Sequence, residues 1–324
     1  MPDPLLYWQA IAASAVCAAA VVATLATMTL TTTRLNSACV LGIGVGLLAG
    51  FYVLSLQLQW PPASSLDRLL LIIVPLALAI ELIGGFGRTS RSVAWLMRVT
   101  LAVFVSPTLL YGSVYFGDHW SISQQIAVVS IGAVLLAIAG GLLCGLAQRR
   151  GGVVISIAIC LSIQCAAVAI MMGGYIKGGA AALPFVAALL TTTIVAKWIS
   201  HRWLQGENFA EIAIVGVGVV ALFGFLFVGR FFGELSTPHA MILMHAPLLC
   251  WIIETPMMRS CRPSITVAAC LLLVAIPLAI VVVLAKQEFD REMAPLLDSS
   301  TVGSPADTMV ISQLDVSLNV ISCR

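Results

Sequence analysis

Residues 67–98 read DRLLLIIVPLALAIELIGGFGRTSRSVAWLMR. The stretch begins with an acidic and a basic residue, continues through a long apolar run, and carries Glu81 shortly before a glycine-rich end and three arginines. A helix needs about 20 mostly apolar residues to cross a membrane, and the run from 69 to 87 is close to that length. We therefore interpret this stretch as a membrane-spanning helix followed by a basic loop.

The composition of the whole chain agrees with this interpretation. The chain has 324 residues, of which 60% are hydrophobic and 9% are charged. Soluble domains carry roughly a quarter charged residues, so the composition excludes an ordinary soluble domain. The net charge of +2 is too small to indicate a nucleic-acid partner or an acidic substrate. We expect the lipid bilayer as the main partner and no nucleic acid.

Ten apolar segments are each near the length of a membrane span. Their approximate bounds are 9–31, 38–58, 69–87, 99–116, 122–147, 153–176, 180–197, 210–229, 240–257 and 265–285. Backbone polar groups in lipid must be satisfied within the segment, so we expect helices. The segments also lack the alternating polarity of a transmembrane β-barrel. The sequence thus predicts an all-α integral membrane protein, a polytopic bundle of about ten transmembrane helices in residues 1–285.

The basic residues predict the orientation of this bundle. If the N-terminus lies outside, the inner loops hold Arg34, Arg88, Arg91, Arg98, Arg149, Arg150, Lys197, Arg202, Arg259 and Arg262, and the outer loops hold Arg68, Lys177 and Arg230. Cytoplasmic loops are enriched in Lys and Arg, so the bias favours this arrangement at each loop. We predict that both termini lie outside the cytoplasm, and we place the protein in a bacterial cytoplasmic membrane.

The last segment, 286–324, is expected to be a separate acidic tail outside the cytoplasm. Apolar and polar residues alternate from Leu314 to Val320, which is typical of a strand with one apolar face. A lone strand is not stable, so it would need a partner in this chain or another. A frayed terminus explains the tail equally well.

We single out two carboxylates within predicted spans, where a charge is costly. Insertion of a charged side chain at mid-helix costs about 2.5–3.5 kcal/mol and less toward the ends. Glu81 has Arg98 as a candidate charge partner, and Glu254 has Arg259; in both stretches a proline precedes the glutamate. One hypothesis is that the two acids bind a cation or relay protons. The alternative is that both are interface anchors, each neutralised by its arginine.

His245 is a third candidate for ion or solute binding. It lies two residues before Pro247, and a proline frees a backbone carbonyl in the preceding turn. We favour a hydrogen bond from His245 to that carbonyl over a ligand-binding role. Prolines are predicted to kink five of the spans, at Pro75, Pro107, Pro184, Pro247 and Pro277. Kinked helices suit a protein that encloses a cavity or moves.

Other patterns indicate packing rather than chemistry. Gly42, Gly46 and Gly50 recur at four-residue spacing, as do Gly141 and Gly145, and such ladders let helices approach closely. The nine cysteines form no C-x-x-C pair and resemble buried small hydrophobes. The sequence contains no catalytic motif, metal-binding pattern or cofactor fingerprint, so we predict no catalytic residue, no metal and no cofactor.

These observations leave three hypotheses for function. The leading one is a transporter or binding protein for a small solute or ion that uses its intramembrane carboxylates, with kinked helices as movable walls. The second is a structural or assembly subunit that docks a partner protein through residues 286–324. The third, and least favoured, is a membrane enzyme acting at the outer surface through Asp118, His119 or His239, because the outer loops are too short to form much of a pocket.

Overall fold

The described part of the chain is helical throughout. The computed structural model describes residues 4–28, 32–85, 90–116, 120–150, 152–203, 211–255 and 263–301. Within these ranges the elements are helices joined by short turns, and no strand occurs. The prediction of an all-α fold is therefore confirmed. The predicted strand between Leu314 and Val320 lies outside the described residues.

Among the described residues, eight helices are long and apolar enough to cross a membrane. They are α1 (Pro4–Met28), α2 (Thr32–Val53), α5 (Arg91–Leu110), α6 (Ile122–Arg150), α7 (Val153–Met172), α8 (Ile176–Trp203), α9 (Ile212–Phe232) and α12 (Pro263–Thr301). This architecture is that of a multi-pass membrane protein, as the sequence predicts.

The third and ninth predicted spans are helical but interrupted. The third consists of α3 (Ser65–Arg68), the π-helical turn η1 (Leu69–Ile73) and α4 (Val74–Gly85). The ninth consists of α10 (Thr237–His245) and the 3₁₀ segment η3 (Ala246–Glu254). We call each predicted span a rod, whether it is one helix or several consecutive helices. With these two interrupted rods, the described bundle has about ten.

Each interruption falls at a proline. Proline lacks a backbone N–H and its ring clashes with the carbonyl four residues earlier, so it disturbs the regular hydrogen bonding of an α-helix. Pro75 lies two residues after the end of η1, where the Val74 N–H donates a hydrogen bond to Leu69 O, five residues back. Pro247 lies in the first turn of η3, where the α-helix changes to a 3₁₀ helix. In contrast, Pro107 and Pro184 lie inside α5 and α8, which remain α-helical.

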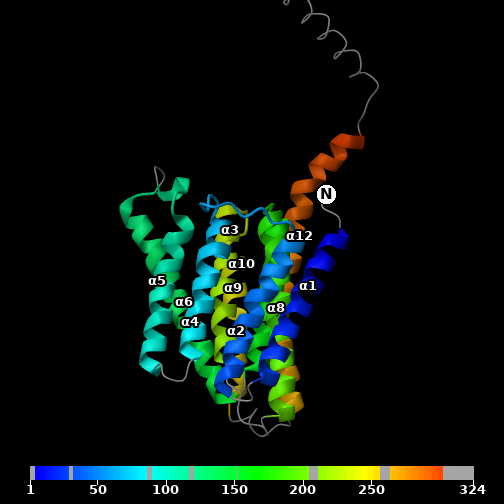
Figure 1. The fold of residues 1–324 in the computed structure, drawn as a ribbon. Helices are drawn as coiled ribbons and strands as arrows, with labels where there is room; N and C mark the ends of the chain where they lie inside the picture. Colours follow the sequence, from blue (N-terminus) through cyan, green and yellow to red (C-terminus); the bar gives the residue numbers. More distant parts are fainter. Residues whose placement is uncertain are drawn as a thin grey trace, which may run out of the picture. The chain divides into compact units, whose positions relative to one another are not determined.

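The helix α9 forms the centre of the bundle. Of its most apolar window, 89% is buried within the protein, against 22% for α6. It packs against α2, α4, α6, α7, α8 and α10, and Figure 1 shows it among these helices. Four glycines along α9, among them Gly216 and Gly224, let neighbouring side chains approach its backbone closely.

The glycine ladder of α2 faces other helices of the same chain. A Cβ at Gly46 would come within 2.8 Å of the Ser14 carbonyl oxygen on α1 and 3.1 Å of Ala188 Cβ on α8. A Cβ at Gly50 would overlap Pro184 on α8. The ladder therefore packs α1, α2 and α8 together, as small residues do between membrane helices.

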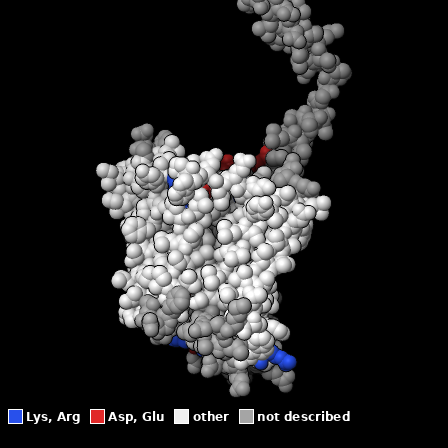
Figure 2. All heavy atoms as spheres, in the orientation of Figure 1, with Lys and Arg blue, Asp and Glu red and all other residues white. Residues whose placement is uncertain are grey.

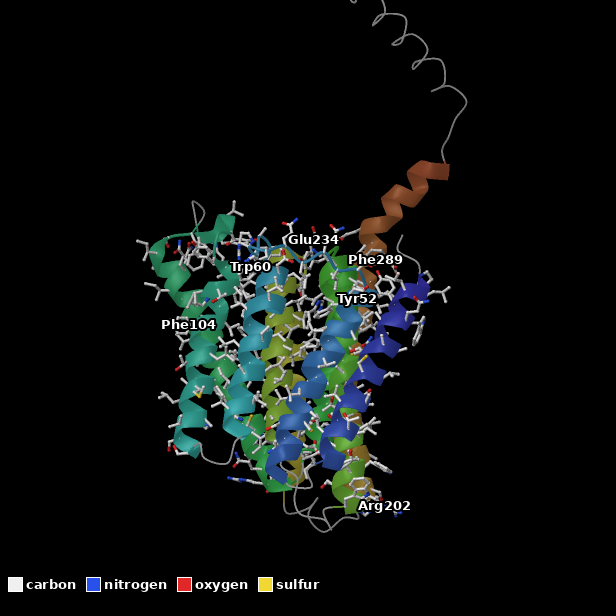
Figure 3. All side chains as sticks on the ribbon, in the orientation of Figure 1. Tyr52, Trp60, Phe104, Arg202, Glu234 and Phe289 are labelled. Carbon is white, nitrogen blue, oxygen red and sulfur yellow. The ribbon has the colours of Figure 1, made fainter. Side chains whose placement is uncertain are left out.

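The two ends of the bundle differ in their side chains. Figure 3 shows Arg202 at one end, with Trp60 and Glu234 at the opposite one. We call these the basic end and the far end. On the visible face in Figure 2, the coloured charged atoms lie toward the ends and a broad middle band shows none. An uncharged band between polar ends is what a membrane-spanning surface requires.

The helix α12 continues beyond the predicted end of the last span. The span was expected to end at residue 285, whereas α12 extends to Thr301. The chain divides into two compact units, Met1–Val282 and Val283–Arg324, and this division falls inside α12. In the second unit, residues 286–292 are helical and exposed. The predicted tail thus begins as a helix.

Candidate functional site

Glu81 and Arg98 form an ion pair inside the bundle. Glu81, on α4, is only 4% exposed. Arg98, on α5, donates two hydrogen bonds to it, from Nε to Oε1 at 2.7 Å and from Nη2 to Oε2 at 2.5 Å. This two-pronged geometry is the strongest arrangement of a guanidinium and a carboxylate. The structure thus brings together the glutamate and the arginine that the sequence suggested as partners.

The fold explains why these two side chains meet. They lie near the end of α4 and the beginning of α5, two consecutive helices that pack against each other. Gly216 of α9 makes room for the carboxylate, because a Cβ at this position would overlap Glu81 Oε1. The pair is therefore enclosed by α4, α5 and α9 rather than displayed on the surface.

A small cavity lies beside the ion pair. Its volume is about 40 Å³, and its lining comes from α4, α5, α6 and α9. Glu81 and Arg98 supply its charged groups, and Gly140, Gly141 and Cys144 of α6 form part of the opposite wall. One water needs roughly 10–15 Å³ of such volume, so the cavity has room for about three water molecules. In this conformation it is too small for an organic solute.

A second buried carboxylate, Glu211, was not singled out from the sequence. It immediately precedes α9, is 1% exposed, and accepts a hydrogen bond from Ser156 Oγ of α7 at 3.2 Å. Burial raises the pKa of Glu211 to about 7, although the hydrogen bond from Ser156 and the charge of Lys197 act in the opposite direction. This carboxyl can therefore exchange protons near neutral pH.

The two carboxylates flank the beginning of α9. Glu81 packs against Gly216, which is five residues after Glu211, or about 7.5 Å along the helix axis. The side chain of Glu211 lies on the side of α7, where a Cβ at Gly152 would meet it at 2.8 Å. The sequence signal for Glu211 was its position directly before an apolar, glycine-rich run. It did not indicate burial, because such residues usually lie in loops.

Polar contacts also join the far ends of the third rod and α5. Ser64 and Asp67 form a capping box at the start of α3. Arg68 donates hydrogen bonds to the carbonyl oxygens of Tyr111 and Ala63, and its guanidinium carbon lies 5.8 Å from the centre of the Tyr111 ring. The rod from Ser65 to Gly85 and α5 are therefore held together by polar groups at both ends, with apolar packing between them.

The structure does not bring Glu254 to the cavity beside Glu81. Glu254 ends η3, which packs against α6, α7 and α10, whereas α4 packs against α2, α5 and α9. None of the described residues that line the cavity belongs to η3. Arg259, the suggested partner of Glu254, lies outside the described residues.

The histidine candidates have separate positions. His245 is exposed and its Nδ1 lies 2.7 Å from Met241 O. This is not the carbonyl freed by Pro247, which belongs to the residue four positions before the proline, Leu243. His239 is buried in α10, and Asp118 and His119 lie outside the described residues. In the ranges described, no three His, Cys, Asp or Glu side chains gather as ligands for a metal ion.

Comparison with models of known protein families gave no match, and a search of curated proteins found no matching relative. The class of the protein therefore follows from its own features. The apolar helices and the uncharged band define an integral membrane protein with multiple helical spans. Within the part of the chain that the structure describes, Glu81 and Arg98 form an internal ion pair beside a cavity.

Proposed function

We propose that the protein is an ion transporter of the membrane, that the proton is the ion it moves, and that Glu81 is the group that exchanges it. The observation that supports this most is the position of a carboxylate, 4% exposed, on the wall of a cavity of about 40 Å³. A charged group in a membrane span is costly, and such residues commonly mark ion pathways and proton relays.

The size and charge of the cavity favour a proton over other small solutes. With room for about three waters, the cavity can hold a short water chain but no organic molecule. The Arg98 guanidinium donates two hydrogen bonds to the Glu81 carboxylate, so a metal cation would have to displace it in order to bind there. A proton, in contrast, can bind Glu81 after only a brief separation of the Glu81 carboxylate from Arg98.

The surrounding groups have supporting roles in this proposal. Arg98 holds Glu81 ionised at rest and releases it when a proton arrives. Glu211, whose pKa is raised to about 7 by burial, collects protons at the basic end and lies about one and a half turns of α9 from the Glu81 contact. The interrupted rods at Pro75 and Pro247 provide helices that can change their hydrogen bonding.

The basic end would face the cytoplasm. The described residues Arg149, Lys197 and Arg202 lie on helix segments at this end, which fits the enrichment of Lys and Arg in cytoplasmic loops. We accordingly propose a bacterial cytoplasmic membrane as the location, with the N-terminus outside the cytoplasm. The C-terminus would lie on the same side after an even number of spans.

The test uses proteoliposomes that contain the purified full-length protein and the pH dye pyranine. A potassium gradient with valinomycin imposes an inside-negative potential, and proton uptake is read as acidification of the lumen. The wild-type protein should acidify the lumen faster than protein-free liposomes, and Glu81→Gln should lose this activity. Glu234→Gln, an exposed control at the far end, should retain it. Equal rates for the wild type and Glu81→Gln would refute the proposal.

An assembly role remains a second proposal because of the extended helix α12. Residues 286–292 continue this helix with exposed, mostly charged side chains, a surface suited to a partner protein. Deletion of 286–324 should then remove a protein that co-purifies with the full chain. Retention of every co-purifying protein would argue against the role.

A further inference from the structure

A groove separate from the ion-pair cavity lies between α6, α9 and α10. Its volume is about 410 Å³, within the usual range of ligand pockets. Its body is apolar, with Ile131 from α6, Phe227 from α9, and Met241 and Met244 from α10 among the lining residues. Of the described residues that line it, none also lines the cavity beside Glu81.

The far end of the groove carries a fixed cation. Arg230, in the last turn of α9, lines the groove together with Thr237 and Trp120. Its Nε donates a hydrogen bond to Thr237 Oγ1 at 2.6 Å, and its guanidinium carbon lies 5.8 Å from the centre of the Phe231 ring. These two contacts orient the guanidinium group at the mouth of the groove.

No acid among the described residues forms an ion pair with Arg230. Among the residues that the structure describes, the ion pair found is Glu81 with Arg98, and no carboxylate pairs with Arg230. Glu234, four residues later, is exposed and makes no ion pair with it. The terminal amino groups of the guanidinium are therefore available to an anion, which they can bind in a planar, two-pronged manner.

We propose that this groove binds an anionic phospholipid of the bilayer, with an acyl chain along the apolar body and the phosphate on Arg230. From Phe223 to Arg230 the groove follows α9 for about 10 Å, a length that an acyl chain segment can fill. Ile131 is 65% exposed and Met241 is 40% exposed, so the groove opens toward the lipid. Trp120 at the same end is a residue type that prefers the headgroup region.

The proposal assigns separate tasks to the two parts of the site. The apolar body accepts the chain of any phospholipid, because burial of methylene groups is not selective. Arg230 selects the anionic headgroup, because a basic residue near the membrane surface attracts anionic lipid. The inference is independent of the proposed proton transport, since it uses neither Glu81 nor its cavity.

The test measures lipid binding to the purified full-length protein. The protein in detergent micelles is titrated with palmitoyl-oleoyl phosphatidylglycerol or with the matched phosphatidylcholine, and bound lipid is counted by native mass spectrometry. The wild type should prefer phosphatidylglycerol, and Arg230→Gln should reduce this preference about fivefold. Met241→Trp, which fills the groove, should weaken binding of both lipids. Ile242→Trp, on an exposed position of α10 that does not line the groove, should bind as the wild type does.

Several results would overturn the proposal. They are equal binding of the two lipids by the wild type, an unchanged preference in Arg230→Gln, or identical effects of Met241→Trp and Ile242→Trp. A dimer mass that falls to a monomer in Met241→Trp would assign the groove to a second copy of the chain instead. Helical circular dichroism verifies folding of each variant. If Arg230→Gln fails to fold, Arg230→Lys replaces it and should give a smaller loss, since Lys keeps the charge but loses the planar fork.

Discussion

Removal of Arg98 should strongly destabilise the protein, and removal of both members of the ion pair should not. In Arg98→Leu, Glu81 loses both hydrogen bonds from the guanidinium in a site where it is 4% exposed, so it must either stay charged without a partner or take up a proton. Breaking a buried ion pair in this way costs about 3–5 kcal/mol. Since the Arg98 side chain is 24% exposed, water can reach part of the vacated site. We therefore expect a loss of about 3 kcal/mol, the lower end of that range.

The double variant Glu81→Met with Arg98→Leu distinguishes this reasoning from a general loss of packing. Replacing a buried ion pair with apolar side chains of similar volume is often neutral, so the double variant should recover most of the stability. The free energy of unfolding is measured by titration of micelle-embedded protein with sodium dodecyl sulfate, followed by circular dichroism. Arg202→Leu, at an exposed position, serves as control. A double variant as unstable as Arg98→Leu, or an Arg98→Leu loss below about 1 kcal/mol, would refute the argument.

Three further predictions concern other parts of the bundle. Gly216→Ala should destabilise the protein by about 1–3 kcal/mol, because its methyl group overlaps a buried carboxylate. Gly145→Ala, in open space, should be neutral or stabilising in the same titration; equal losses would contradict this. Burial raises the pKa of Glu211 from its ordinary 4.5 to about 7, so the folded protein binds this proton more tightly than the unfolded chain does. The melting temperature should therefore fall as pH rises from about 4.5 through about 7 and level off above, and Glu211→Gln should flatten this part of the profile. The thiols of Cys250 and Cys270 interact with each other, and both residues are buried. A mild oxidant should therefore link them, so that the unfolded protein has two fewer maleimide-reactive thiols; an unchanged number of thiols would show that the two residues are apart.

The membrane fold could be predicted from the sequence because it depends on local composition. A run of apolar residues long enough to cross lipid must form a helix wherever its neighbours lie. The apolar pattern indicates a span at 210–229, and the structure has α9 at Ile212–Phe232. The change of helix type at Pro75 and Pro247 also has a local cause, although the sequence indicated only kinks and not which helix type would replace the α-helix.

The candidate site could be predicted only in part, because it depends on which helices are neighbours. Glu81 and Glu254 look alike in sequence, each with a preceding proline and a following arginine. They differ in the structure because α4 packs on α5 and α9, whereas η3 packs on α6 and α7. Glu211 was missed for the same reason. Its burial comes from Gly152 and Ser156 of α7, which are more than fifty residues away in sequence.

Almost nothing in the sequence indicated the proposed lipid-binding groove. In the sequence, Arg230 and Glu234 are four residues apart at the end of an apolar run, a pattern that favours a snorkelling pair at a membrane surface. The structure instead shows Arg230 bonded to Thr237 of α10. That contact requires the chain to turn back after α9 and place α10 beside it, which no local pattern indicates.

The measurement that tests the central claim most directly is an infrared difference spectrum of the reconstituted protein under an imposed proton gradient. If Glu81 exchanges protons with the cavity, the gradient should produce a protonated carboxyl band that disappears in Glu81→Gln and persists in Glu234→Gln. Arg98→Leu should change the size of the band, because the guanidinium no longer holds the carboxylate ionised. A spectrum in which Glu81→Gln is identical to the wild type would contradict the account, and the ion pair would then be a structural anchor.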